Sequence, residues 1–405
     1  MFGWEFPPHN SGGLGVACQG LVRALSDQGT ETVFVLPKKV DCQSDCCEII
    51  FGDDFCKIGG LKIKEINSLL SPYITSGAYN SLISRIKENN IYGQDLFNEV
   101  KRYGIAGGEI AAGENFDLIH AHDWLSFLAG LEAKKISKKP LVVQIHATEF
   151  DRTGGNNINR FVYKIEKEGM DKADKVIAVS NFTKNIIIEN YGIDKEKVEV
   201  VYNAVEHSDF PIFNRELFNL KKDGRKIVLF VGRITLQKGP DYFLRAAKKV
   251  LERNRNVIFI IAGSGDMESQ IIEEAAWLGI ADKVLFAGFL RGDDLARIYQ
   301  MADLYVLSSV SEPFGITPLE ALANQTPVLV SKQSGVSEVI HHCLKVDFWD
   351  VNEMANKILA VLEYPQLHLS LKENGSQEVK NISWQDSARR CLEIYQDVLS
   401  GYSRA

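Results

Sequence analysis

Short apolar runs alternate along the chain with stretches that repeat apolar residues at helical spacing. In the first half the runs are ETVFVL, FDLIHAH, PLVVQIH, KVIAVS and KVEVVYNAV, and in the second half KIVLFVGRI, NVIFIIAG, KVLFAGF, DLYVLSS and TPVLVS. Amphipathic segments, such as residues 14–26 and 123–134, separate them. Buried strands that alternate with helices are typical of βαβ units. The pattern predicts an α/β protein with two doubly wound parallel sheets in tandem.

The periodicity lapses between the halves, in EHSDFPIFNRELFNLKKDGR. We therefore predict one Rossmann-like domain over residues 1–210 and a second over 220–380. Residues 52–110 fit no βαβ unit and are interpreted as a mainly helical insertion. An amphipathic helix over residues 384–399 ends the pattern. Only residues 1–5 are available for a first strand, so either that strand is unusually short or the sequence starts late.

The composition of the chain argues against a nucleic-acid-binding protein and against a membrane-spanning one. The chain has 405 residues, of which 45% are hydrophobic and 24% charged, which is typical of a soluble globular protein. A net charge of −7 gives no basic footprint for nucleic acid. No apolar run approaches the roughly 18 residues of a membrane span, and the start, MFGWEFPPHN, lacks the basic region of a signal peptide. Seven cysteines, an odd number, favour a reducing, cytoplasmic location.

Two groups of potential metal ligands stand out, and neither predicts a metal site. The cysteines of CQSDCC, with Cys56 nearby, lack the paired spacing of zinc ligands and are interpreted as free thiols on a loop. His120 and His122 lie two positions apart, but no third ligand has a convincing spacing. We therefore expect no metal.

The first glycine-rich turn is NSGGLG, residues 10–15, between a short strand and a helix. Glycines let a backbone approach a phosphate, and a helix N-terminus offers free N–H donors. A dinucleotide-binding fold would have GxGxxG here, but Cys18 occupies the third glycine position. This argues against the rival interpretation, a nicotinamide-dependent oxidoreductase. A plain strand-to-helix turn remains the simpler alternative.

A pair of cations follows the first strand of the second half, in FVGRITLQKGPDYF. Arg233 comes directly after this strand, and Lys238 lies just before a helix that we expect to begin at Pro240. Ligands of doubly wound sheets gather at the carboxyl edge, so the two cations predict an anion clamp. The alternative is that each is a solvated surface charge.

The stretch SEPFGITPLEAL holds two carboxylates, Glu312 and Glu320. Its simplest interpretation is a capping box, with Thr317 as N-cap, Pro318 at the first helical position and Glu320 reaching back. That interpretation leaves Glu312 and the turn 315–317 unexplained. If the backbone N–H groups of this turn hold a diphosphate, the carboxylates can accept hydrogen bonds from hydroxyl groups nearby. Such a ligand is a nucleotide sugar.

Two polar motifs follow strands of the first half, HAHDW and QIHATEFDR. They place Asp123 and His146 at strand ends. A lone histidine at a strand end is usually structural, but His146 is followed by polar residues and is the better active-site candidate.

In this order, SGGLG, HAHDW, QIHATEFDR, VVYNAVE, FVGRITLQKG, AGSG and SEPFGITPLEAL resemble the retaining GT-B glycosyltransferases, and more narrowly the glycogen/starch synthase and sucrose-phosphate synthase branch. The resemblance implies a GT-B fold, in which two Rossmann-like domains face a central cleft and the terminal helix packs back on the first domain. One departure is Asn10, where the bacterial glycogen and starch synthases have lysine. This weakens the case for strict use of ADP-glucose.

The resemblance also implies residue roles. Arg233 and Lys238 would bind the donor diphosphate, Glu320 the ribose, and Glu312 the transferred sugar. The donor would also contact backbone groups of Gly315, Ile316 and Thr317 and of Gly12 and Gly13. His146 would contact the donor sugar, and Asp123 would lie on the acceptor side.

The implied reaction is transfer of a hexosyl group, in the first place glucosyl, from UDP- or ADP-glucose to a hydroxyl group of a carbohydrate acceptor, with an α-glucan as one candidate. The transfer occurs with retention and without a cofactor. The alternatives are a non-glucan acceptor (a sucrose-phosphate-synthase-like enzyme or one acting on a cell-surface glycan), a GT-B epimerase, and a non-catalytic module that binds sugar nucleotides.

Overall fold

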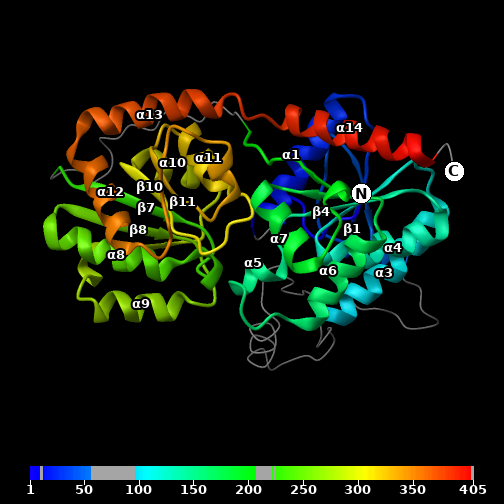
Figure 1. Ribbon diagram of the computed structural model, residues 1–405, viewed down its shortest axis with the longest axis horizontal. Coiled ribbons are helices and arrows are strands. Elements are labelled where there is room, and N and C mark those ends of the chain that lie inside the picture. Colours follow the sequence, from blue (N-terminus) through cyan, green and yellow to red (C-terminus); the bar gives the residue numbers. More distant parts are fainter. Residues whose placement is uncertain (10–11, 56–95, 207–220, 222–223, 403–405) are drawn as a thin grey trace. The chain divides into compact units, whose positions relative to one another are not determined.

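The structure is a computed structural model that describes residues 1–9, 12–55, 96–206, 221 and 224–402 (Figure 1). The chain divides into two compact units. Unit 1 is Met1–Asn203 with Trp384–Ala405, and unit 2 is Ala204–Ser383. Most of the sequence-predicted insertion and of the linker between the domains lies outside the described residues.

Unit 1 is built on parallel strands, β3 (Ile119–His122), β4 (Leu141–Ile145), β5 (Lys175–Ala178) and β6 (Val198–Val200), paired in that order. A separate parallel pair consists of β1 (Val33–Leu36) and β2 (Glu48–Phe51). Phe2 bridges Val35 of β1 and Ala121 of β3, both in parallel. The first strand of this unit is therefore reduced to a bridge at Phe2, which joins the two sheets.

Helices cover the strands of unit 1: α1 (Gly13–Asp27), α3 (Leu96–Gly113), α4 (Trp124–Ser137), α5 (Glu149–Thr153), α6 (Arg160–Lys172) and α7 (Asn181–Tyr191). Every residue of β4 is buried, as expected for an apolar run covered on both faces. The sequence assigned residues 96–110 to an insertion, but α3 belongs to the core. Its Tyr103 is fully buried and donates to the carbonyl oxygens of Gly3 (3.0 Å) and Val35 (2.7 Å).

Unit 2 is a parallel sheet in the order β12 (Leu344–Val346), β11 (Val328–Ser331), β10 (Leu304–Leu307), β7 (Lys226–Val231), β8 (Val257–Ala262) and β9 (Val284–Gly288). Counted from β7, the spatial order is that of a doubly wound Rossmann sheet, and its direction reverses between β7 and β10. The helices of the unit are α8 (Pro240–Arg253), α9 (Glu268–Trp277), α10 (Gly292–Met301), α11 (Ile316–Ala323), α12 (Val351–Glu363) and α13 (Pro365–Val379).

After unit 2 the chain returns to unit 1 as α14 (Trp384–Tyr402), which lies along α1 (Figure 1). Its apolar face is buried and includes Ala388, Cys391 and Tyr395. The hydroxyl of Tyr395 lies 2.7 Å from Nδ1 of the buried His120 in β3. Gly20 of α1 leaves room for the ring of Trp384, since a Cβ at that position would lie 2.4 Å from a ring atom.

The close approach of Gly20 to Trp384 yields a stability prediction. Alanine normally favours a helix over glycine by about 1 kcal/mol. We expect Gly20→Ala to destabilise unit 1 instead, by about 1–3 kcal/mol, because the added methyl group overpacks the contact with Trp384. Gly113→Ala, near which a Cβ meets no atom within 4 Å, is the matched control and should be neutral or stabilising. Chemical denaturation of both variants measures the difference, and equal effects would contradict the packing argument.

Candidate functional site

The candidate site of unit 2 lies where β7 and β10 run side by side and the winding reverses. Loops from the carboxyl ends of these two strands meet there, at the place where doubly wound sheets bind ligands. The loop after β7 contains Arg233 and Lys238, and the loop after β10 contains Glu312. The structure therefore brings together three of the residues that the sequence singled out.

Hydrogen bonds join the two loops. The backbone N–H of Val310 donates to the carbonyl of Gln237 (2.9 Å), and the hydroxyl of Ser308 donates to the carbonyl of Gly239 (2.8 Å). The buried side chain of Gln237 accepts a hydrogen bond from Nη2 of Arg233 (3.1 Å). Pro240 occupies the first turn of α8 as predicted, so the short loop ends in a fixed helix start. The guanidinium group is thus oriented by a residue of its own loop.

An ion pair links the loops directly. Nζ of Lys238 lies 2.5 Å from Oε2 of Glu312, and the hydroxyl of Ser309 donates to the same oxygen (3.0 Å). Both charged side chains are largely buried, at 16% and 7% exposure. An ammonium group carries three N–H donors, and among the described residues Glu312 is the partner of this one. Lys238 can therefore keep its pairing with Glu312 and still donate to a second anionic group.

The backbone of Glu312 is fixed by the loop that follows β11. Its N–H donates to the carbonyl of Gln333 (2.9 Å), and its carbonyl accepts from the N–H of Gly335 (2.9 Å). The carboxylate thus has a defined backbone position next to three strand ends, those of β7, β10 and β11.

The capping box predicted for Thr317 and Glu320 is wrong. Helix α11 begins at Ile316, with Gly315 as N-cap and no side-chain capping bond. Gly315 has φ 102°, a conformation that favours glycine, and a Cβ there would lie 3.1 Å from Cγ of Glu312. The helix therefore starts two residues earlier than the Thr-Pro pattern suggests. Its first N–H groups receive no capping side chain and point out of the helix end.

Two tyrosines missed by the sequence analysis hold the polar residues of α11. The hydroxyl of Tyr305 lies 2.8 Å from that of Thr317, and the hydroxyl of Tyr299 donates to Oε2 of Glu320 (2.9 Å). Burial raises the pKa of Glu320, and the bond from Tyr299 partly opposes this shift. Tyr299 and Tyr305 occur within otherwise apolar patterns, so only their contacts reveal a polar role.

In unit 1, Asp123 and His146 also come together. Asp123 follows β3, and Oδ1 of its carboxylate accepts from the backbone N–H groups of His146 (2.6 Å) and Ala147 (3.3 Å), directly after β4. Asp123 has φ 60° and ψ 166°, a strained conformation for a residue other than glycine. Burial raises the pKa of Asp123 to about 6, against the lowering effects of Arg152 and these N–H groups. The carboxylate thus positions the backbone that carries His146.

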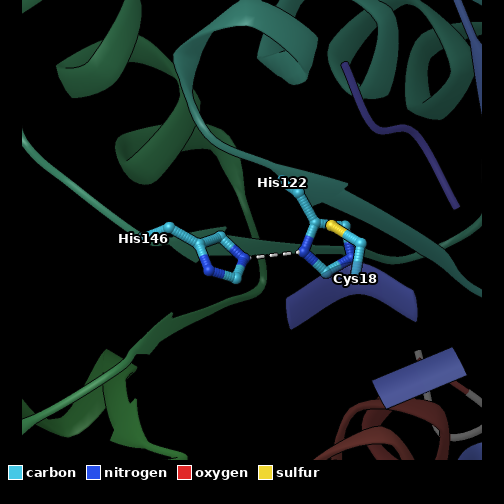
Figure 2. A group of neighbouring side chains, drawn as sticks. All are labelled: Cys18, His122 and His146. Carbon is cyan, nitrogen blue, oxygen red and sulfur yellow. Dashed lines mark hydrogen bonds between the residues drawn. The ribbon is translucent and has the colours of Figure 1, made fainter. Parts of the chain in front are cut away.

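The ring of His146 points toward that of His122, and Nε2 of the former lies 3.1 Å from Nδ1 of the latter (Figure 2). Burial lowers the pKa of His146 to about 3 and that of His122 well below its usual value. Both rings are therefore neutral at ordinary pH, and one of them donates this hydrogen bond while the other accepts it. His146 is 9% exposed, whereas His122 is fully buried.

The rest of QIHATEFDR supports this loop. Thr148 and Asp151 form a capping box at the start of α5. Nη1 of Arg152 donates to the carbonyl of Ala147 (2.9 Å), while its other nitrogens pair with Glu149 and the buried Glu166. The backbone after β4 is thus held from both sides.

Gly12 and Gly13 lie at the start of α1, where Gly12 is the N-cap in an extended conformation. Gly12 itself has no side chain that could cap this helix start. Asn10, at which the sequence departs from the glycogen synthases, lies outside the described residues.

Folds and loops of this kind occur in known proteins. The family model for glycosyl transferases group 1 matches residues 214–378, and that for glycosyltransferase family 4 matches residues 11–209. An uncharacterized glycosyltransferase of Methanocaldococcus jannaschii is 31% identical over 98% of this chain and 97% of its own. A D-inositol 3-phosphate glycosyltransferase of Salinispora arenicola is 30% identical over 72% of this chain and 71% of its own. A glycogen synthase of Mycobacterium tuberculosis is 26% identical over 98% of this chain and 93% of its own.

Solved structures agree on the fold. Sucrose-phosphate synthase from Thermosynechococcus elongatus has a TM-score of 0.76 at 21% identity and covers 99% of this chain and 98% of its own. Anabaena HepE in complex with UDP-glucose has a TM-score of 0.70 at 17% identity, with 98% of each chain covered. The two Rossmann-like units are those of a GT-B glycosyltransferase. The chain belongs to the group 1 glycosyltransferase family. Among the described residues, no helix has the length and apolar character that crossing a membrane requires.

The ion pair between Lys238 and Glu312 yields a second prediction. We expect Lys238→Ala to lower the free energy of unfolding by up to about 3 kcal/mol, because Glu312 then keeps a buried charge without its cation. The exposed pair Lys332–Asp347 (2.8 Å) is the control, and Lys332→Ala should cost no more than about 1 kcal/mol. In a double-mutant cycle with Glu312→Ala, we expect the combined loss to be smaller than the sum of the single losses. Equal effects of the two lysine substitutions would contradict a structural role for the pair.

The shifted pKa of Glu320 yields a third prediction. Because the folded-state pKa is raised, the folded protein binds this proton more tightly, and the associated stability is lost as pH rises through the folded pKa. Glu320→Gln keeps an acceptor for Tyr299 and removes the charge. We expect the variant to be more stable than the parent at pH 7 and to lose that advantage near pH 4, where a carboxyl group is protonated in the unfolded chain too. Urea unfolding at both pH values measures this, and a gain independent of pH would disprove it.

Proposed function

We propose that this chain is a retaining glycosyltransferase that moves a glucosyl group from UDP-glucose or ADP-glucose to an acceptor hydroxyl, with an α-glucan as the first candidate acceptor. The observation that carries the proposal is the meeting of Arg233, Lys238, Glu312 and the start of α11 at the winding reversal of unit 2. This arrangement offers cations and backbone donors for a diphosphate beside carboxylates for hydroxyl groups.

On the donor side, Arg233 and Lys238 bind the diphosphate together with the backbone of Gly315, Ile316 and Thr317. Glu320, held by Tyr299, accepts hydrogen bonds from the ribose hydroxyls. Glu312 keeps its pairing with Lys238 and accepts from a hydroxyl of the transferred sugar. The carboxylates thus contact neutral groups of the donor, while the cations contact its charge.

In unit 1, His146 contacts the donor sugar through a neutral ring, since its pKa of about 3 excludes a role as a proton donor in its charged form. Asp123 acts through the backbone of His146 and lies on the acceptor side. Gly12 and Gly13 let the diphosphate approach the backbone at the start of α1.

The chemistry follows from where charge develops. As the sugar leaves the diphosphate, negative charge grows on the leaving oxygen, and preorganised cations and N–H donors stabilise it. Arg233 and Lys238 are oriented by Gln237 and Glu312 before any ligand binds, which lowers the reorganisation needed during the reaction. The cations supply the charge that a metal cofactor would otherwise bring.

A small phosphorylated acceptor is the second candidate. The relative at 30% identity is named for D-inositol 3-phosphate, and the solved structure with the TM-score of 0.76 is a sucrose-phosphate synthase. The glycogen synthase is 26% identical but covers 98% of this chain, which supports the glucan. Both acceptors therefore belong in the same experiment.

The fourth prediction is a pattern of nucleoside diphosphate release. UDP-glucose and ADP-glucose are each incubated with the protein alone, with a maltooligosaccharide and with D-inositol 3-phosphate. We expect release to rise with the oligosaccharide for one of the donors. Lys238→Ala should lower that rate about 100-fold or more, since loss of one preorganised contact costs roughly 3 kcal/mol in the transition state.

Each other outcome has a definite meaning. A rise with D-inositol 3-phosphate alone replaces the glucan by a small acceptor. Slow release of nucleoside diphosphate that neither acceptor accelerates excludes both acceptors and still supports use of the donor. Donor binding by calorimetry without any release identifies a non-catalytic module, and a Lys238→Ala variant with normal turnover removes Lys238 from the donor site.

A further inference from the structure

A group of metal-ligand side chains lies inside unit 1. Cys18 comes from α1, His122 from the end of β3, and His146 from the loop after β4 (Figure 2). One ligand atom of each residue lies within 4.8 Å of the others, and all three side chains are buried. Among the described residues, the loop cysteines Cys42 and Cys46 form no such group. Cys18 lies far from the histidines in sequence, so spacing rules could not reveal it.

The distances suit a tetrahedral ion. Two imidazole nitrogens bound to zinc at its usual bond length lie about 3.3 Å apart, and a thiolate sulfur lies about 3.6 Å from each of them. Nδ1 of His122 and Nε2 of His146 are 3.1 Å apart. The separation of the two ring nitrogens is therefore close to that at a zinc ion, and the thiol sulfur, which lies within 4.8 Å of them, needs to approach by about 1.2 Å at most.

Charged groups of both signs act on these ligands. The carboxylates of Asp123 and Glu5 act electrostatically on the thiol of Cys18, and the N-terminal ammonium group acts on His122. A dication bound beside the thiolate would be attracted by the carboxylates. Both histidine side chains are buried, and imidazole binds a metal ion in its neutral form.

We propose that Cys18, His122 and His146 form a binding site for a thiophilic divalent metal ion, with Zn²⁺ as the first candidate. Mixed sulfur and imidazole ligands favour zinc over magnesium or calcium. On binding, the thiol proton is released to solvent, and the proton shared between the two rings moves to the opposite nitrogen of its ring. Three protein ligands leave the fourth position of the ion to water.

Such an ion would also act on catalysis. Coordination through Nε2 fixes the ring of His146, so a bound ion excludes a donor sugar that needs this ring in a different position. This consequence rests on the proposed function, whereas the metal site itself does not. The ion is then an inhibitor and not a cofactor.

The fifth prediction uses Co²⁺ as a spectroscopic probe. The parent protein for this experiment is a variant in which Cys42, Cys46, Cys47 and Cys56 are each replaced by Ser, so that these thiols cannot bind Co²⁺. Titration with Co²⁺ should give one equivalent with thiolate-to-metal charge-transfer absorption, and Zn²⁺ should displace it. Cys18→Ala should abolish the absorption and weaken Zn²⁺ binding by at least about 100-fold. A loss of this size exceeds what is usual when a residue that only supports a metal ligand is removed.

Controls separate the site from general effects. Cys391→Ala removes another fully buried thiol, on α14, and should leave the Co²⁺ spectrum unchanged. His146→Ala removes the least buried ligand, so it should lower the affinity while the circular dichroism of the fold is retained. Absorption that persists in Cys18→Ala, or a parent that shows none, overturns the proposal.

A last arm separates the site from the proposed function. Saturating UDP-glucose or ADP-glucose should raise the Co²⁺ concentration needed for half saturation in the same parent protein. If Co²⁺ binds through Cys18 and neither donor has this effect, the metal site stands and the donor-sugar role of His146 is wrong.

Discussion

The ion pair between Lys238 and Glu312 is the constraint on which the candidate site of unit 2 depends. It joins the loop after β7 to the loop after β10, across the line where the winding of the sheet reverses. A buried ion pair contributes little net stability compared with apolar packing, but its loss is costly. Its value here is geometric, because it holds a cation at the carboxyl edge. The same pairing fixes Glu312 beside the start of α11, where the conformation of Gly315 favours glycine and a Cβ would make tight contacts.

A carboxylate of unit 1 also positions a loop, in this case through hydrogen bonds from the backbone. Asp123 follows β3 and accepts from two backbone N–H groups that follow β4. In both units a carboxylate at one strand end thus sets the position of the loop at another strand end. The difference lies in what is positioned. In unit 2 it is a charge, Lys238, and in unit 1 it is a neutral ring, His146.

How much of this could be predicted from the sequence depends on the range of each interaction. Strand runs such as KIVLFVGRI and the helix start at Pro240 are local signals, and both are correct. The capping box at Thr317 is also a local signal, yet it fails. The hydroxyl of Thr317 contacts that of Tyr305 within the folded unit. The helix begins after Gly315, two residues before the predicted start. Local propensity gives way where a packed contact competes with it.

Contacts between distant segments leave no comparable signal. Glu320 appeared to be paired within its own helix start, but its partner is Tyr299 on α10. Likewise, α3 fits no βαβ unit in the sequence, and only the bonds of Tyr103 to residues near the N-terminus show that it belongs to the core. For the same reason the sequence analysis interpreted Cys18 only as the residue that interrupts a glycine motif. Its proximity to His122 and His146 depends on two strand ends that are distant in sequence.

The neutrality of the buried histidines connects the proposed reaction with the proposed metal site. Burial lowers the pKa of His122 and His146, so in the proposed reaction neither ring supplies a proton or a positive charge to the leaving diphosphate. The proposal gives that task to Arg233 and Lys238 of unit 2, which pair with Gln237 and Glu312. A neutral imidazole with an available lone pair is, however, the form that coordinates metal. The neutral ring that the proposed reaction uses for hydrogen bonding to a sugar is therefore also suited to the proposed metal site, where the thiolate of Cys18 would favour zinc over a harder ion.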